Sequence, residues 1–145
     1  MLKLQKKNAD IIFGDTDIVD LSGNFISKRH LSAPEILTKK SFAKGMLVCH
    51  QAFMVKKNLA GEYNLDYRFS SDYDWCVRCL DNSNPERCIN LKEVTIDFLS
   101  AGISDKNKKI SLWERFKIMV RHYGMLPTLI NHFQFIVRAI RRGRL

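Results

Sequence analysis

The sequence predicts one α/β domain, with a mixed sheet and flanking helices, followed by C-terminal amphipathic helices. Short apolar runs bounded by polar turns recur in its first hundred or so residues, as strands do. Two longer runs with helical periodicity occupy its C-terminal part. A chain of 145 residues that is 46% hydrophobic and 10% aromatic is long enough for one core, and its composition argues against disorder.

The N-terminal elements are a helix end and three short strands. Residues 2–8 are Lys-rich and have no capping residue ahead of them, which is typical of the end of a helix. Residues 9–15 predict a buried strand that runs into a polar turn. Residues 18–20 and 25–27 predict two strands joined by a hairpin turn with the sequence Gly-Asn.

The middle of the chain alternates short elements with turns. Residues 34–40 predict one or two helical turns. Residues 46–55 predict a strand whose polar centre, Cys49-His50-Gln51, must face something polar. After a turn at 58–62 and an aromatic segment at 63–69, the remaining predicted elements are a helix from Ser71 or Asp72 to about Leu80, an edge strand at 94–98 and a turn at 101–104.

The C-terminal part predicts two amphipathic helices, Ser111 to about Tyr123 and Pro127 to about Arg142. Residues 106–145 carry ten Lys and Arg against Glu114 alone, which accounts for the whole net charge of +9. Residues 1–105 are neutral, with 14 basic and 14 acidic residues. The sequence therefore predicts a globular part at 1–105 and a basic two-helix extension at 106–145.

Three interpretations of the basic extension are open: a solvated helix face, a surface that binds anionic lipid, and a nucleic-acid tail. An apolar stripe opposite Arg138 and Arg141 is useful at a bilayer and has no role against phosphates. We therefore expect an anionic membrane surface as partner and no nucleic acid. No apolar run reaches the ~20 residues that a membrane-spanning helix needs.

Four cysteines occur without an N-terminal signal sequence, which favours a reducing, cytoplasmic setting. Cys76 and Cys79 have the spacing of half a zinc site or a redox pair. Because no second pair at a matching distance exists, we expect them to be buried helix cysteines. We expect no metal ligand in this chain.

Asp72 is the candidate catalytic residue. A helix N-terminus fixes a carboxylate there and favours its charged form, which suits a general base. The alternative is a plain N-cap aspartate. Asp74 lies two residues on and is either a second charge that favours the helix dipole or a partner for Arg78. His50 and Gln51 point to opposite faces of a strand, so at least one of them meets a site or a polar partner.

Ser70-Ser71-Asp72-Tyr73-Asp74 and the earlier His50-Gln51 resemble the acceptor-side, carboxyl-terminal half of a family 2 inverting glycosyltransferase domain with the A-type fold. The resemblance runs from about Asn8 through Ser104. It implies that Asp72 is the catalytic base and that His50, Gln51 and Asp74 contact the substrate. The implied donor is a nucleotide-diphosphate sugar, and the implied acceptor is a saccharide or a lipid-linked molecule in cell-envelope polysaccharide synthesis.

The resemblance also implies what this chain lacks. The strand with Asp15 and Asp17 matches one that follows the family's metal motif, so we do not expect these residues to bind metal. A complete enzyme would use Mg²⁺ or Mn²⁺, held upstream of Met1 or by a companion chain, and the isolated chain would be inactive. The alternative is an accessory binding module without a donor site. The location implied is cytoplasmic, with attachment to the inner face of the cell membrane.

Overall fold

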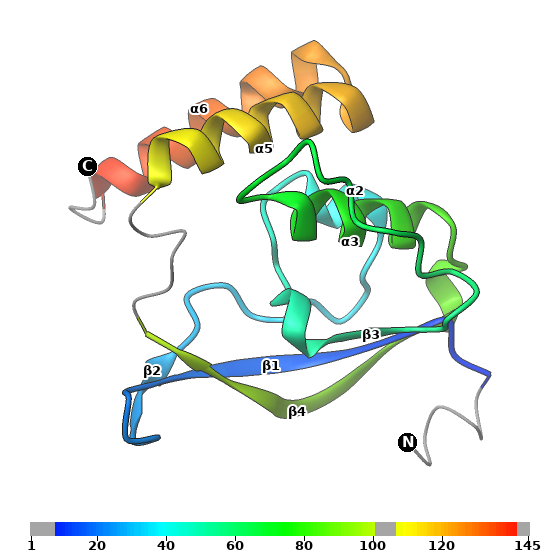
Figure 1. Cartoon of the computed structure of the whole chain (residues 1–145), viewed down its shortest axis with the longest axis vertical. Coiled ribbons are helices and arrows are strands. Elements are labelled where there is room, and N and C mark those ends of the chain that lie inside the picture. Colours follow the sequence, from blue (N-terminus) through cyan, green and yellow to red (C-terminus); the bar gives the residue numbers. More distant parts are fainter. Residues whose placement is uncertain (1–7, 101–106, 142–145) are drawn as a thin grey trace.

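The computed structural model describes residues 8–100 and 107–141, and it confirms the α/β class and the mixed sheet (Figure 1). β1 pairs with the other strands of a four-stranded sheet. It runs parallel to β4 and antiparallel to β2 and β3. The strands are β1 (Ile11–Val19), β2 (Phe25–Lys28), β3 (Phe53–Val55) and β4 (Cys88–Leu99).

β1 is longer than expected, because the sequence analysis divides it into a strand at 9–15 and another at 18–20. The two expected pieces form one strand because β4 pairs along its whole length, from Ile11 to Val19. The register shifts on both sides of Asp15. The hairpin turn before β2 is confirmed, with Gly23 at φ 83° and the N–H of Asp20 donating to the carbonyl of Asn24 at 3.0 Å.

The helices lie on one side of the sheet in Figure 1, and they form the core with it. α3 (Ser71–Asp81) confirms the expected helix and contributes Tyr73, Cys76 and Val77 to the core. α2 (Lys39–Phe42) begins later than expected, because Thr38 and Ser41 form a reciprocal capping box.

The expected strand at 46–55 is wrong over most of its length. His50–Ala52 form a 3₁₀ turn, η1, and only the last three residues of that range pair in β3. The N–H of Ala52 donates to the carbonyl of Cys49 at 2.9 Å and closes the turn. The expected edge strand at 94–98 is the second half of β4, which begins after a second 3₁₀ turn, η2 (Pro85–Arg87).

α5 (Lys108–Tyr123) and α6 (Met125–Arg141) confirm the two expected C-terminal helices, although each begins a little earlier than expected. Ile118 and Met119 of α5 are fully buried in the same core cluster as α3. α5 is therefore a part of the core, whereas the sequence analysis treats it as an extension. Among the described residues no helix is long and apolar enough to cross a membrane.

Two predicted elements lie outside the described residues. The turn at 101–104 does so entirely, and the helix end at 2–8 does so except for its last residue, Asn8.

Candidate functional site

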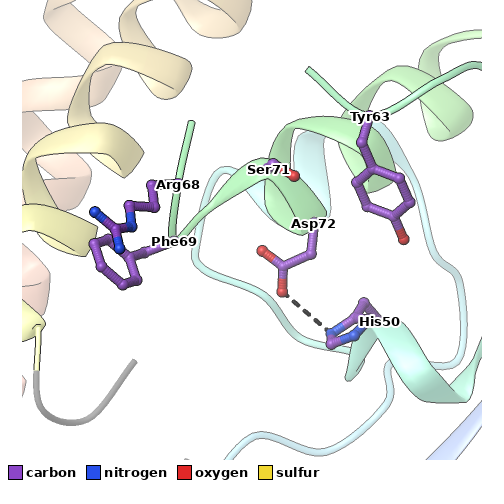
Figure 2. Close-up of a pocket in the computed structure, with 6 residues that line it drawn as sticks. All are labelled: His50, Tyr63, Arg68, Phe69, Ser71 and Asp72. Atoms are coloured by element: carbon purple, nitrogen blue, oxygen red, sulfur yellow. Dashed lines mark ion pairs between the residues drawn. The ribbon is translucent and has the colours of Figure 1, made fainter. Parts of the chain in front are cut away.

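A pocket of about 290 Å³ lies at the N-terminal end of α3 (Figure 2). Its walls come from the 3₁₀ turn η1, from the loop before α3 and from the first turn of α3. The lining residues are His50, Tyr63, Arg68, Phe69, Ser71 and Asp72. The structure thus brings together two residues that lie more than twenty positions apart in the sequence, His50 and Asp72.

The carboxylate of Asp72 faces the imidazole of His50, with Oδ2 of Asp72 3.1 Å from Nδ1 of His50 (Figure 2). The other oxygen, Oδ1, accepts the backbone N–H of Tyr73 at 2.8 Å. The side chain of Asp72 remains 27% exposed and that of His50 33% exposed, so both are reachable from the pocket. Asp72 is the second residue of α3, whose N-cap is Ser70, so it is not the N-cap itself.

Several groups determine the charge of Asp72. Burial acts to raise the pKa of its carboxyl group. The hydrogen bond and charge of His50, the N–H of Tyr73 and the charge of Arg115 together outweigh burial and hold that pKa below its ordinary value. Asp72 is therefore ionised at neutral pH, as a proton acceptor has to be.

Gln51 lies beside His50 but does not line the pocket. Its side chain is exposed, whereas that of His50 is half-buried at the pocket wall. The alternation expected for a strand does not apply, because the two residues belong to a 3₁₀ turn. The expected substrate contact of Gln51 stays a prediction.

Asp74 lies inside the protein and is only 1% exposed. Its Oδ2 pairs with Nε of Arg78 and its Oδ1 with Nε2 of His122, each at 2.8 Å. The expected partnership with Arg78, within α3, is thereby confirmed. The contact with His122 is a second one, and it ties α3 to α5. The expected substrate contact of Asp74 stays a prediction, although its buried position favours a structural role.

The aromatic ring of Tyr63 lines the pocket together with Asp72. The sequence predicted only an aromatic segment at 63–69 in this part of the chain. The ring of Tyr63 stacks on that of Trp75, with centroids 5.3 Å apart. Nε1 of Trp75 donates to the carbonyl of Gly61 at 2.6 Å, which fixes the loop over α3. Burial, with Cys76 and Asp72 nearby, raises the pKa of Tyr63, so its hydroxyl group stays protonated.

α5 holds the loop that forms the rim of the pocket. Glu114 accepts the backbone N–H groups of Arg68 at 2.9 Å and Phe69 at 2.8 Å. The hydroxyl of Ser70 donates to the carbonyl of Ser111 at 3.2 Å. These contacts were not predicted from the sequence. The lone acidic residue in a basic segment was the one signal that pointed to them.

The structure places the cysteines and the two acidic residues of β1. Cys76 and Cys79 are buried in α3, as expected, and burial raises the pKa of Cys79 to about 11. The carboxylate of Asp15 accepts the N–H of Ala33 at 2.9 Å. Neither Asp15 nor Asp17 lines the pocket. In the part of the chain that the structure describes, no three His, Cys, Asp or Glu side chains are grouped so as to hold a metal ion.

Comparison with known proteins finds relatives among glycosyltransferases. Over 77 residues, which are 51% of this chain, the sequence is 31% identical to proteins of Mycobacterium bovis and Mycobacterium tuberculosis. Each is named "PGL/p-HBAD biosynthesis glycosyltransferase". The match covers 27% of each relative, so the chain spans little more than a quarter of their length. No family model matches the chain.

Proposed function

We propose that this chain is the acceptor-side half of an inverting, family 2 glycosyltransferase in which Asp72 is the general base. The observation that carries the proposal is the carboxylate of Asp72, paired with His50 at 3.1 Å on an open pocket at the start of a helix. The glycosyltransferase relatives support the reaction class over half of the chain. The α/β fold is compatible with part of such a domain.

In the proposed reaction, a hydroxyl group of the acceptor donates its proton to the carboxylate of Asp72. The hydroxyl oxygen forms a bond to the anomeric carbon of the donor sugar from the face opposite the leaving nucleoside diphosphate. The bond between that carbon and the diphosphate oxygen breaks, and its electron pair leaves with the diphosphate. His50 holds the carboxylate in place, and most of the rate would come from proton acceptance and positioning.

Mg²⁺ or Mn²⁺ would neutralise the leaving diphosphate in a complete enzyme. The described residues do not fit such an ion, because they offer no cluster of metal-ligating side chains. We propose that the donor site and its ion belong to a companion segment.

The acceptor of the proposed reaction is a saccharide or a lipid-linked molecule. Tyr63 supports a saccharide, because its ring is half-exposed, rigidly stacked on Trp75 and placed at the pocket with Asp72. Sugar rings present apolar C–H faces that pack against aromatic rings, while their hydroxyl groups need polar partners. Gln51 and Asp74 are retained as weaker candidates for substrate contact on the resemblance alone.

The test is the Asp72→Asn substitution, assayed together with the segment that supplies the donor site. The amide keeps the shape of the carboxylate but does not accept the proton, so turnover should fall by roughly 10²–10⁴. Asp66→Asn is the matched control, because Asp66 is an exposed carboxylate in the loop before α3 and does not line the pocket. Full activity of Asp72→Asn would contradict the assignment and favour the accessory binding module.

A further inference from the structure

α6 turns its apolar stripe away from the rest of the protein. Leu126, Leu129, Ile130 and Phe133 are spaced i, i+3, i+4 and i+7, and their exposed fractions run from 50% to 73%. Residues at this spacing share one face of a helix. A helix on the surface of a globular domain normally buries such a stripe.

The other face of α6 is the one that packs on α5. Thr128 is fully buried, and the ring of His132 lies 5.1 Å from that of Phe116. The orientation of α6 is therefore fixed by the protein, and its outward apolar face has no partner among the described residues. α5 adds the indole of Trp113, which is 61% exposed.

The exposed charges of α5 that the structure describes are of one sign. Lys109, Lys117 and Arg121 of α5 are exposed. Glu114 is the one acidic residue of 106–145, and it is buried, with both carboxylate oxygens bound to backbone N–H groups. The described part of this segment therefore presents basic side chains and apolar side chains, and no acidic ones, to its surroundings.

We propose that the outward face of α6, which we call the α6 stripe (Leu126, Leu129, Ile130 and Phe133), lies on the surface of an anionic lipid bilayer. Basic residues bind the headgroups, and the apolar side chains enter the boundary with the acyl chains. A second copy of the chain would bring two faces of the same positive charge together. Nucleic acid would match the charge but would leave the apolar side chains exposed.

This placement has a consequence for the pocket, and that consequence rests on the proposed function. α5 carries Trp113 and, one residue on, Glu114, which binds the loop at the rim of the pocket. A bilayer contact through α6 would therefore attach the lipid surface to the helix pair that holds the rim of the pocket. A lipid-linked acceptor would then be supplied from the same bilayer. Binding to the bilayer needs no catalysis, so the two proposals fail separately.

The first test is sedimentation of the 145-residue chain with phosphatidylcholine vesicles that contain phosphatidylglycerol, compared with phosphatidylcholine alone. The wild type should bind the anionic vesicles. Replacing two members of the α6 stripe, Ile130→Ser with Phe133→Ser, should weaken binding by about tenfold or more, even at low salt. Leu21→Ser with Leu65→Ser is the matched control, since both leucines are 89% exposed but lie outside α6. The control pair should bind as the wild type does.

The second test removes charge. Lys117→Gln with Arg121→Gln should weaken binding to the anionic vesicles by about fivefold for each charge removed, and less at high salt. Lys44→Gln with Lys57→Gln removes the same charge from exposed positions outside α5 and α6 and should have a smaller effect. Circular dichroism checks that each variant is folded.

Several results would overturn the proposal. One is a wild-type chain that binds no anionic vesicle, and another is a control pair that weakens binding as much as its test pair. A third is a dimer, found by analytical ultracentrifugation, that Ile130→Ser with Phe133→Ser abolishes, because the stripe would then bind a second copy. A fourth is a chain that binds no vesicle but binds an oligonucleotide tightly, and loses that binding in Lys117→Gln with Arg121→Gln but not in Ile130→Ser with Phe133→Ser. That result would indicate a nucleic-acid surface.

Discussion

Glu114 of α5 accepts the backbone N–H of Phe69 at 2.8 Å, across 45 positions of sequence. The same carboxylate accepts the neighbouring N–H of Arg68. These two amides immediately precede the N-cap of α3, so a residue of the C-terminal segment fixes the chain where it enters the helix that carries Asp72. The pocket and α5 are therefore parts of one structural unit.

We expect Glu114→Gln to lower the free energy of unfolding by about 1–3 kcal/mol. The buried carboxylate accepts one backbone N–H with each of its two oxygens, whereas the amide of Gln has only one oxygen that can accept. Hydrogen exchange at the amides of Arg68 and Phe69 should become faster than elsewhere in the loop. Glu62→Gln changes an exposed carboxylate and should alter neither. Unchanged exchange at both amides in Glu114→Gln would show that the contact does not hold the rim.

We expect His50→Ala to raise the pKa of Asp72. Burial already acts in that direction, and His50 is the largest of the groups that oppose it. Because the pKa is lowered in the wild type, the ionised carboxylate stabilises the fold above its ordinary pKa, and this contribution is lost as the pH falls through the lowered value. This stabilising contribution should be smaller in the variant, because the pKa of Asp72 is no longer lowered by His50.

Carbon-detected NMR titration of Asp72 measures this shift in the isolated chain, without any assay of activity. Gln51→Ala is the matched control, because Gln51 is the exposed neighbour of His50 and does not line the pocket. An equal rise in the control, or no rise in His50→Ala, would show that the 3.1 Å contact does not set the charge of Asp72.

We expect Asp74→Ala to destabilise the fold by about 2–4 kcal/mol, since it leaves Arg78 and the mostly buried His122 without their partner. Asp81→Ala removes an exposed ion pair with Lys39 from the same helix and should lose no more than about 1 kcal/mol. Urea denaturation measures both. Equal losses would mean that the buried pair has no special weight.

The pH dependence of the stability difference between the wild type and Asp74→Ala is a separate check. Burial acts to raise the pKa of Asp74, but the contacts with His122 and Arg78 outweigh it and lower the pKa. The stabilising contribution of Asp74 is therefore present above the ordinary carboxyl pKa of about 4 and is lost as the pH falls through the lowered value. The wild type and Asp74→Ala should approach each other in stability as the solution is acidified through that range.

We expect Gly14→Ala to destabilise the sheet. A Cβ atom at Gly14 would lie 2.5 Å from Cγ2 of Thr95 and 2.7 Å from the carbonyl oxygen of Glu93, so β1 and β4 would have to separate. The loss should be about 1–3 kcal/mol by urea denaturation. Gly61→Ala is the control, because its nearest neighbour is the flexible end of Arg78 at 3.1 Å. A neutral Gly14→Ala would show that the strands have room to adjust.

The sequence predicted the elements whose signals are local. Gly23 at the hairpin turn, the polar start of α3 and the apolar stripe of α6 each lie within a few residues of the structure they specify. The candidate residues Asp72 and His50 were also found from their neighbours in sequence. The structure places both at one pocket.

The full extent of β1 and the orientation of Gln51 were not predicted from the sequence. β1 is one strand because β4, more than seventy residues later, pairs along it. His50 lies in a 3₁₀ turn, and its neighbour Gln51 therefore turns to solvent rather than to the opposite face of a strand. The extent of β1 has no local signal, because its hydrogen bonds are formed with another strand. The turn at His50 is closed locally, by the N–H of Ala52 and the carbonyl of Cys49, and alternation of apolar and polar residues does not reveal it.

The sequence by itself determined the fold class, the helix that carries Asp72 and the concentration of positive charge in the C-terminal part. Only the tertiary structure decided which charges are structural and which are accessible. Asp74 and Glu114 are buried by contacts across elements, whereas Asp72 keeps an open side. The physical reason is that burial of a carboxylate requires partners, and for Glu114 and Asp74 these include groups more than forty residues away, the N–H of Phe69 and the imidazole of His122.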